Sequence, residues 1–214
     1  FVLREALKEL GIKPENTTAS VQGFGNVAQY AIRKYIELGG KVIAISCWDF
    51  NDKTAYTYRK KDGINVEELL SITDSFGSID KEKARALNYE VLPGEEWLKQ
   101  DVDILIPAAL ENQITKDNVG SISPQVKVIV EGANGPTSNE ADLVIKEKGI
   151  FLVPDFLANA GGVTCSYFEQ VQSNTNFYWS KEEVLEKLDA KMTAAYHGVS
   201  EVARKQKVYM RDAA

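Results

Sequence analysis

The sequence predicts an α/β protein with a Rossmann-like, doubly wound and mainly parallel sheet that carries helices on both faces. Strand-like apolar runs alternate with amphipathic helical segments along the chain, the pattern of parallel α/β folds. A Gly-x-Gly-x-x-Ala turn, Gly23 to Ala28, lies between a strand-like run and a helical one. Since neither a repeat nor a low-complexity linker interrupts the 214 residues, we expect one domain over 1–214.

The first elements in order form a βαβ unit. Phe1 to Leu10 has helical spacing but begins without a capping residue. A short strand then leads into the glycine turn, and an amphipathic helix follows it and stops at Gly39-Gly40. The next run, Lys41 to Ser46, is too short for a helix and is typical of a buried strand. Strand, turn, helix and strand within about thirty residues make the unit.

Later elements extend the same alternation. A small β-excursion is expected at 55–59, and short helices at 66–72 and 81–87. Two capping boxes, Thr137–Glu140 and Ser180–Glu183, predict the starts of two further helices. The first helix covers 141–147, and the second has one apolar face made of Leu185, Leu188, Met192, Tyr196 and Val199. The remaining strands are expected at 103–107, 126–130 and 150–153.

Composition narrows the classes of function. The net charge of −6 and the lack of a basic face argue against nucleic acid as the main partner. The longest apolar runs are strand-sized, so we expect no membrane span. Cys47 and Cys165 form no Cys-x-x-Cys pair, which favours a reducing, cytoplasmic setting. The single histidine, His197, lies in a helical stretch, so neither a metal site nor a catalytic histidine is expected.

The glycine turn has the chemistry of a phosphate-binding loop. Gly23 permits a tight bend, and Gly25 lets backbone N–H groups approach a pyrophosphate without a Cβ in the way. Ala28 is small enough for the helix to pack closely on the sheet, and the helix N-terminus offers free N–H donors. The predicted cofactor-binding residues of this turn are Gly23, Phe24, Gly25, Asn26 and Val27.

Three later loops add a second group of candidates. They follow strands, at 107–112, 131–137 and 155–163, and each joins small residues to an amide or an acid. Ligands of open parallel sheets bind at this end of the strands. Small residues allow a flat ring to lie against backbone, and Asn134 and Asn159 can hydrogen-bond a carboxamide.

Three motifs, Gln22–Val27, Glu131–Thr137 and Asn159–Glu169, resemble the cofactor-binding domain of glutamate dehydrogenases, and the resemblance covers essentially the whole chain. It implies that Asn134 and Asn159 hold a nicotinamide, with Ala108, Ala109 and Gly132 beside it. It also implies that Val163 and Ser166 line a substrate pocket, with the Ser166 hydroxyl reaching the side-chain carboxylate of glutamate.

The resemblance also implies what this chain lacks. The family's catalytic lysine and aspartate belong to an N-terminal domain that precedes such a segment. Residues 1–10 and 209–214 start and stop without a cap or a breaker, so we expect a domain excised from an enzyme. We therefore predict no catalytic residue here: the chain binds a dinucleotide, but does not interconvert L-glutamate and 2-oxoglutarate alone. The resemblance further implies a homohexamer for the full-length protein, with contacts largely in the other domain, which leaves a monomer open for this chain.

NAD is the favoured cofactor, with NADP left open. Dinucleotide folds that prefer NAD carry an acid about twenty residues past the glycines. Here the strand ends Ser-Cys47-Trp48-Asp49, so the acid is displaced to Asp49 or to Asp52. Trp48 can stack on adenine or pack on the strand, and Lys53 lies near enough to meet a 2′-phosphate.

Two other functions remain open. The cofactor domain of a leucine or phenylalanine dehydrogenase shares the fold and the Asn-Ala-Gly-Gly-Val string at 159–163, but usually lacks a serine at position 166. A stand-alone dinucleotide-sensing module is the alternative outside enzymes.

Overall fold

All 214 residues are described by a computed structural model, which contains one seven-stranded sheet of order β4-β3-β2-β1-β5-β6-β7. The five strands β2, β1, β5, β6 and β7 run parallel to one another, whereas β3 pairs antiparallel with β2 and the edge strand β4 pairs antiparallel with β3. The predicted fold class is confirmed. The strands are β1 (Thr18–Gln22), β2 (Lys41–Asp49), β3 (Thr54–Arg59), β4 (Glu90–Pro93), β5 (Ile104–Pro107), β6 (Val128–Val130) and β7 (Phe151–Val153).

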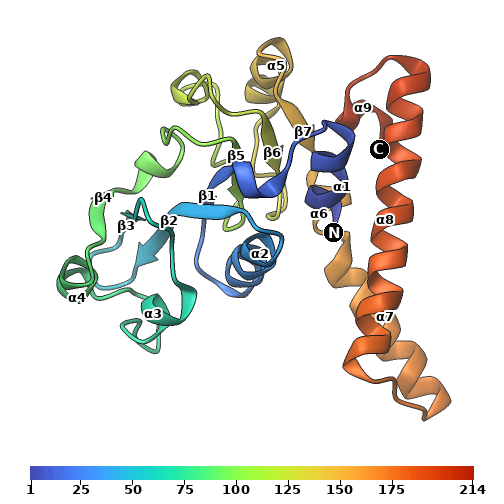
Figure 1. The fold of residues 1–214 in the computed structure, drawn as a ribbon, viewed down its shortest axis with the longest axis horizontal. Coiled ribbons are helices and arrows are strands. Elements are labelled where there is room, and N and C mark those ends of the chain that lie inside the picture. Colours follow the sequence, from blue (N-terminus) through green and yellow to red (C-terminus); the bar gives the residue numbers. More distant parts are fainter.

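Nine α-helices accompany the sheet (Figure 1). They are α1 (Val2–Glu9), α2 (Asn26–Glu37), α3 (Val66–Leu70), α4 (Lys81–Ala86), α5 (Asn139–Glu147), α6 (Asp155–Ala158), α7 (Ala160–Thr175), α8 (Lys181–Gln206) and α9 (Met210–Ala213). Short 3-10 turns lie at Pro14–Asn16, Gly94–Trp97 and Val119–Ser121. None of the helices combines the length and the apolar character that a membrane crossing requires.

The sheet separates two hydrophobic cores. In β5, Ile104 and Ile106 face the larger core, while Leu105 between them faces the smaller one, as strand geometry dictates. The larger core lies under α1, α2 and α8, and the smaller one under α5 and the 3-10 turns at Gly94–Trp97 and Val119–Ser121. Helices therefore cover both faces of the sheet, and the carboxyl ends of the parallel strands are left uncovered by these helices.

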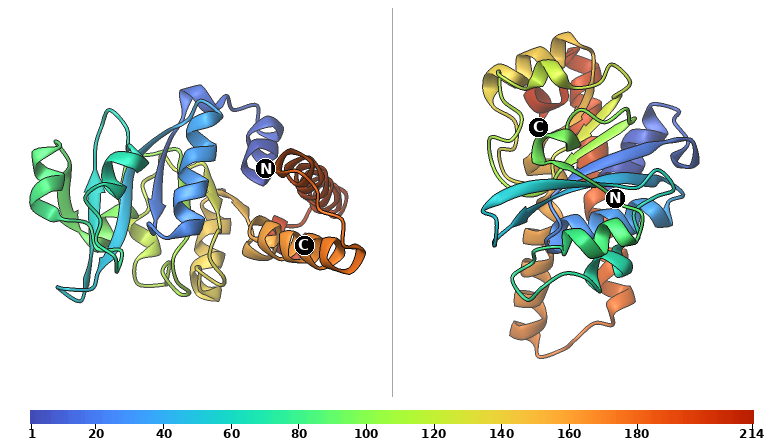
Figure 2. Two further views of the ribbon diagram at one scale, coloured as in Figure 1. Left: turned by 90° about the horizontal axis from the view of Figure 1, so that it is seen from below. Right: turned by 90° about the vertical axis from the view of Figure 1, so that its left-hand side faces the viewer.

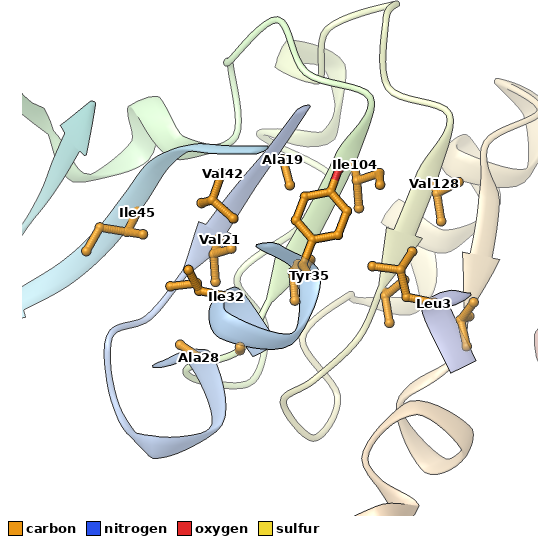
Figure 3. Packing of buried hydrophobic residues seen from close by; sticks show 14 of the residues in the cluster. Leu3, Ala19, Val21, Ala28, Ile32, Tyr35, Val42, Ile45, Ile104 and Val128 are labelled. Atoms are coloured by element: carbon orange, nitrogen blue, oxygen red, sulfur yellow. The ribbon is translucent and has the colours of Figure 1, made fainter. Parts of the chain in front are cut away.

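Helix α2 fixes the glycine turn against the larger core. Its buried residues Ala28, Ile32 and Tyr35 lie over the central strands (Figure 3). Burying Ile32 alone contributes roughly 2 kcal/mol. The Tyr35 hydroxyl lies 2.5 Å from Thr17 Oγ1, next to the start of β1. The helix therefore begins at a fixed place directly after the turn.

Helices α7 and α8 form an antiparallel pair beside the sheet, and α1 packs against α8 (Figures 1 and 2). Arg4 of α1 donates to both carboxylate oxygens of Asp189 at 2.7 and 2.6 Å. The predicted capping box at Ser180 and Glu183 is present, with both reciprocal hydrogen bonds formed. The first and the last third of the chain are therefore held together by α8.

Three sequence expectations differ from the structure in detail. Strand β2 continues to Asp49 instead of ending at Ser46, because its last residues pair with β3. Helix α5 is capped by Ser138, which accepts the Ala141 N–H, and not by Thr137, which forms a bridge with Ile114. On α8, Leu185 is exposed, whereas Leu188, Met192 and Tyr196 are buried as expected.

Candidate functional site

The loops that sequence reasoning selected meet at the carboxyl edge of the parallel strands. The Gly23 turn follows β1, the Ala108 segment follows β5, and the Gly132 segment follows β6. The Gly132 N–H donates to the Pro107 carbonyl at 2.9 Å, and the Ala108 N–H donates to the Gln22 carbonyl at 2.8 Å. Neighbouring strands thus hold the three loops together.

Gly23 has no room for a side chain. Its φ of +112° is a conformation that L-residues rarely adopt. A Cβ at this position would lie 2.8 Å from the Ala108 carbonyl oxygen and 3.2 Å from Ala109 Cβ. The first glycine is therefore required by the contact between the β1 and β5 loops.

Gly25 is a glycine for a different reason. Its φ of −74° suits any residue, and a Cβ there would meet nothing within 4 Å. It is the N-cap of α2 and provides no side-chain cap. The N–H groups of the first helical turn have no partner inside the helix and carry the positive end of its dipole. Gly25 therefore leaves open space in front of an anion-binding helix end.

A pocket of about 620 Å³ lies beside these glycines. None of its lining residues is charged, and most are apolar. They are Gly23, Phe24, Gly25, Asn26, Val27, Cys47, Trp48, Phe50, Phe76, Gly77, Ala108, Ala109 and Leu110. The pocket brings together all the residues predicted from the glycine turn, together with Trp48, Ala108 and Ala109.

Sequence reasoning missed part of the aromatic wall. Trp48, Phe50 and Phe76 are 48%, 57% and 75% exposed, unusually open for such large apolar side chains. Phe76 was not among the predicted site residues, and only its large aromatic side chain among polar neighbours could have indicated it. Apolar rings around an open pocket suit a flat ligand.

Cys47 stands at the end of β2, where many dinucleotide folds place an acid. Its Sγ donates to the Gly77 carbonyl at 3.3 Å. Burial raises the pKa of the thiol to about 12, and neighbouring carboxylates, Asp49 among them, add to the shift. The thiol is therefore neutral and ties β2 to the loop that carries Phe76.

The structure places Asp49 outside this pocket. The side chain is buried, contacts Lys81 and accepts the N–H groups of Asn51 and Asp52 at 2.8 and 3.0 Å. Burial on its own raises the pKa of Asp49, but Lys81 and the N–H groups more than offset this and lower it. Asp52 contacts Lys81 as well, at 3.0 Å. The geometry therefore engages both acids in holding the β2–β3 turn.

Asn134 lies in the loop after β6, and Asn159 is the single residue between α6 and α7, so the segment 155–163, expected as a loop, is largely helical. The structure brings the two side chains together. Asn159 Nδ2 donates to Asn134 Oδ1 at 2.7 Å. Gly132 lies between this pair and the glycine turn: a Cβ there would be 3.2 Å from Ala108 Cβ and 3.5 Å from Val27 Cγ1. Gly132 and Asn159 also line a second pocket, of about 330 Å³, between α1, α2 and the start of α7. Val27 borders both pockets, so the two are neighbours.

Val163 and Ser166 lie on α7 and line neither pocket. Val163 is 71% exposed, and the Ser166 hydroxyl donates to the Gly162 carbonyl of its own helix at 3.3 Å. The two residues therefore face open solvent, one and two turns after Asn159. Sequence reasoning gave them a role that needs a second surface opposite them.

The arrangement has the means to bind but few means to transfer protons. It offers helix N–H groups, an apolar cleft and two carboxamides, while no lysine, carboxylate or histidine lines the larger pocket. His197 lies on α8, where its Nε2 is 3.3 Å from Glu5 Oε2. No group of three or more His, Cys, Asp and Glu side chains is arranged to hold a metal ion. Both cysteines are free thiols.

Comparison with known proteins finds one family along the entire chain. The family model described as glutamate/leucine/phenylalanine/valine dehydrogenase matches residues 1–214. The catabolic NAD-specific glutamate dehydrogenase of Bacillus subtilis is 43% identical over 212 residues, which are 99% of this chain and 47% of that protein. The chain thus spans about half the length of the curated relatives it matches.

Solved structures give the same result. The crystal structure of glutamate dehydrogenase from Peptoniphilus asaccharolyticus is 39% identical, with a TM-score of 0.79, and the match covers 99% of this chain and 47% of that one. The hetero-hexameric glutamate dehydrogenase from Thermus thermophilus is 27% identical, with a TM-score of 0.86 and the same coverage.

Proposed function

The chain belongs to the glutamate/leucine/phenylalanine/valine dehydrogenase family, and we propose from this premise that it is the dinucleotide-binding domain of an NAD-dependent glutamate dehydrogenase. The observation that carries the proposal is the pair of glycines in the first turn. Gly23 is required by the fold itself, whereas Gly25 is required by nothing within 4 Å. A glycine that leaves the space in front of a helix N-terminus empty is explained by a ligand that must approach the backbone there.

The other predicted residues suit the rest of a dinucleotide, some in the larger pocket and others beside the second one. The pyrophosphate would lie at Gly25, Asn26 and Val27, where the N–H groups and the dipole of α2 offset its charge. Adenine would lie against Trp48 and the other exposed rings. The nicotinamide carboxamide would lie at Asn134 and Asn159, with Ala108, Ala109 and Gly132 beside the ring.

NAD fits this pocket better than NADP. A 2′-phosphate needs a cation near the end of β2, and the lining residues include neither lysine nor arginine. Lys53 is not among them, and Lys81 is engaged by Asp49 and Asp52. The Bacillus relative carries NAD specificity in its name. With Cys47 in the acid's usual place, the preference for NAD would come mainly from the missing cation.

A bound nicotinamide would supply the hydride acceptor for oxidation at the Cα of L-glutamate. This chain would orient the carboxamide through Asn134 and Asn159 and would supply one wall of the substrate cleft through Val163 and Ser166. A lysine and a carboxylate that handle the protons of an iminium intermediate need a closed, dry cleft. No carboxylate lines either pocket, and the one lysine that does, Lys34 in the second pocket, pairs with Glu37 at 2.7 Å. We therefore propose that the chain alone binds the cofactor without turnover.

Fluorescence titrations with NADH and NADPH test the binding, alongside an assay of glutamate oxidation by the same chain. We expect saturable NADH binding, weaker NADPH binding and no turnover. For alanine variants of the glycine turn, Gly120→Ala serves as the matched control, because Gly120 lies far from the turn in sequence and a Cβ there meets nothing within 4 Å. Tighter binding of NADPH would overturn the cofactor assignment, and turnover by the chain would overturn the proposal that it binds the cofactor without catalysis.

Glutamate is the proposed substrate, rather than a branched or aromatic amino acid, because the exposed Ser166 hydroxyl can meet a second carboxylate. The test is Ser166→Val in a protein that joins this chain to a substrate-binding half, compared with Ser173→Val on the same helix. Loss of glutamate oxidation with Ser166→Val alone is expected. Unchanged glutamate activity, or activity that was directed at leucine from the outset, would refute the substrate assignment.

The assembly proposal is limited to the larger protein. Since the Thermus relative is described as hetero-hexameric, we propose a hexamer for an enzyme that contains this domain. Light scattering on the chain by itself is expected to give the mass of a monomer.

A further inference from the structure

A buried carboxylate lies behind the Asn134 loop. Glu131 directly follows β6, and its side chain is 0% exposed. Burial raises the pKa of Glu131, although its contact with Arg211 opposes the shift. An ionised carboxylate in such a place needs a cation and N–H donors to be tolerated. Arg211 of α9 supplies the cation: its Nη2 donates to Glu131 Oε1 at 2.8 Å.

From Glu131 a chain of hydrogen bonds reaches the two carboxamides. The second carboxylate oxygen, Oε2, accepts the Asp155 N–H at 2.9 Å. The Asp155 carboxylate in turn accepts the Gly135 N–H at 2.8 Å. Gly135 directly follows Asn134, whose Oδ1 accepts from Asn159 at 2.7 Å. Arg211 is therefore linked by hydrogen bonds to the backbone of Gly135, and the last step to the carboxamide pair runs through the peptide bond between Gly135 and Asn134.

Arg211 is a shared partner of three acids. Besides Glu131, its guanidinium lies 3.1 Å from Asp142 and 3.5 Å from Asp155. These acids come from the end of β6, from α5 and from the start of α6. A planar guanidinium can face several carboxylates at fixed angles, which a lysine ammonium cannot. One side chain of α9 thus sets the relative position of the segments that carry Asn134 and Asn159.

We propose that Arg211 is a positioning residue for the nicotinamide end of the site, acting through Glu131 and Asp155 on the Asn134 loop. The inference rests on the proposed function, since it assumes that the carboxamides hold the nicotinamide. The pocket at Trp48 is built from other segments and makes no contact with Arg211. Loss of Arg211 therefore weakens binding of the nicotinamide half of NADH and leaves binding of the adenosine half unchanged.

The test compares NADH with ADP-ribose, which has the same adenosine diphosphate but no nicotinamide. Calorimetric titrations of this chain are expected to give, for Arg211→Met, a Kd for NADH raised about tenfold and a Kd for ADP-ribose changed less than twofold. Arg211→Lys keeps the positive charge without the planar guanidinium and is expected to retain part of the NADH affinity that Arg211→Met loses. Asp155→Ala removes the acceptor of the Gly135 N–H and is expected to show the same selectivity as Arg211→Met.

Lys146→Met is the matched control. Lys146 pairs with Asp212 at 2.8 Å, so this variant loosens α9 without touching Glu131. If Lys146→Met reproduces the NADH-selective loss, or if Arg211→Met weakens NADH and ADP-ribose equally, Arg211 only stabilises the fold. Should Arg211→Met fail to fold, Asp155→Ala decides, and an unchanged Kd for NADH there overturns the inference. A wild-type chain that binds ADP-ribose but gains nothing from the nicotinamide refutes the proposed function instead.

Discussion

The two glycines of the turn at 23–25 should respond to alanine in opposite ways. In Gly23→Ala, an L-residue must adopt a φ of +112°, which costs about 1–3 kcal/mol. The new Cβ also lies 2.8 Å from the Ala108 carbonyl oxygen, and displacing that backbone costs a further 1–3 kcal/mol or so. The two costs together reach about 2–6 kcal/mol, a large part of the stability of an ordinary domain.

Gly25→Ala meets neither obstacle. Its φ of −74° suits alanine and the space is open, so only the weaker N-cap opposes the change. That loss of about 0.5–1 kcal/mol is offset by a gain of similar size from a less flexible unfolded chain. The added methyl group instead occupies the approach to the first turn of α2, where the pyrophosphate is proposed to bind.

Thermal unfolding followed by circular dichroism, with and without NADH, separates the two effects. For a chain of this size 1 kcal/mol shifts Tm by about 2–4 °C, so Gly23→Ala should lower the Tm of the free chain by at least about 4 °C. NADH at about one hundred times its Kd stabilises the wild type by roughly 2.7 kcal/mol, and Gly25→Ala should lose most of this shift with little change in the free chain. A free Gly23→Ala chain as stable as the wild type would refute the steric argument, and a full NADH shift in Gly25→Ala would refute the placement of the pyrophosphate.

Three other predictions concern the pocket wall, the helices and acid stability. Trp48→Ala should raise the Kd for NADH about 5- to 30-fold, because stacking of a base on a ring contributes about 1–3 kcal/mol and this ring is half exposed. Trp48→Phe should keep most of the affinity. Equal titration curves for the wild type and Trp48→Ala would exclude stacking. Gly198→Ala, at an exposed position inside α8 with nothing within 4 Å, should stabilise the chain by about 0.5–1 kcal/mol, whereas Gly40→Ala should cost about 1–3 kcal/mol because its Cβ would overlap the Tyr35 ring. Urea unfolding measures both changes, and a change of the same sign for the two variants would contradict the packing. The hydrogen bonds from Arg4 lower the pKa of Asp189 to about 2, so this ion pair stabilises the fold above about pH 4, and its contribution is lost as the pH falls from about 4 to 2. After solvent screening the contribution amounts to about 1 kcal/mol. Asp189→Asn should therefore flatten the dependence of stability on pH between 4 and 2, and an unchanged dependence there would contradict this prediction.

Local patterns predicted the parts of the site whose causes are local. The strand–turn–helix at 18–37 follows from residue spacing and from the two glycines, so its position could be predicted closely. The Ser180 capping box was confirmed because both partners lie within four residues of each other. Asn134 and Asn159 were selected for their places after strands, and the structure brings them to 2.7 Å.

The remainder depends on partners that are distant in sequence. Cys47 to Asp49 continue β2 because β3 pairs with them, and the carboxylate of Asp49 is held by Lys81, which lies 32 residues away. Nothing near Asp49 in the sequence indicates that partner. Arg211 likewise meets Glu131 across 80 residues, so a motif that names Glu131 gives no indication of the cation behind it.

The contact of α1 with α8 has a consequence for synthesis. Arg4 and Asp189 are 185 residues apart, and ribosomes add about 5–20 residues per second, so α1 waits roughly 10–40 s for its partner helix. During that interval the side chains of Val2, Leu3, Ala6 and Leu7, all buried in the folded chain, lack part of the surface they pack against, because α1 contacts α8 as well as β7 and α6. The nascent α1 is thus a segment that chaperones should bind until α8 emerges, and a strand-based core must assemble without it.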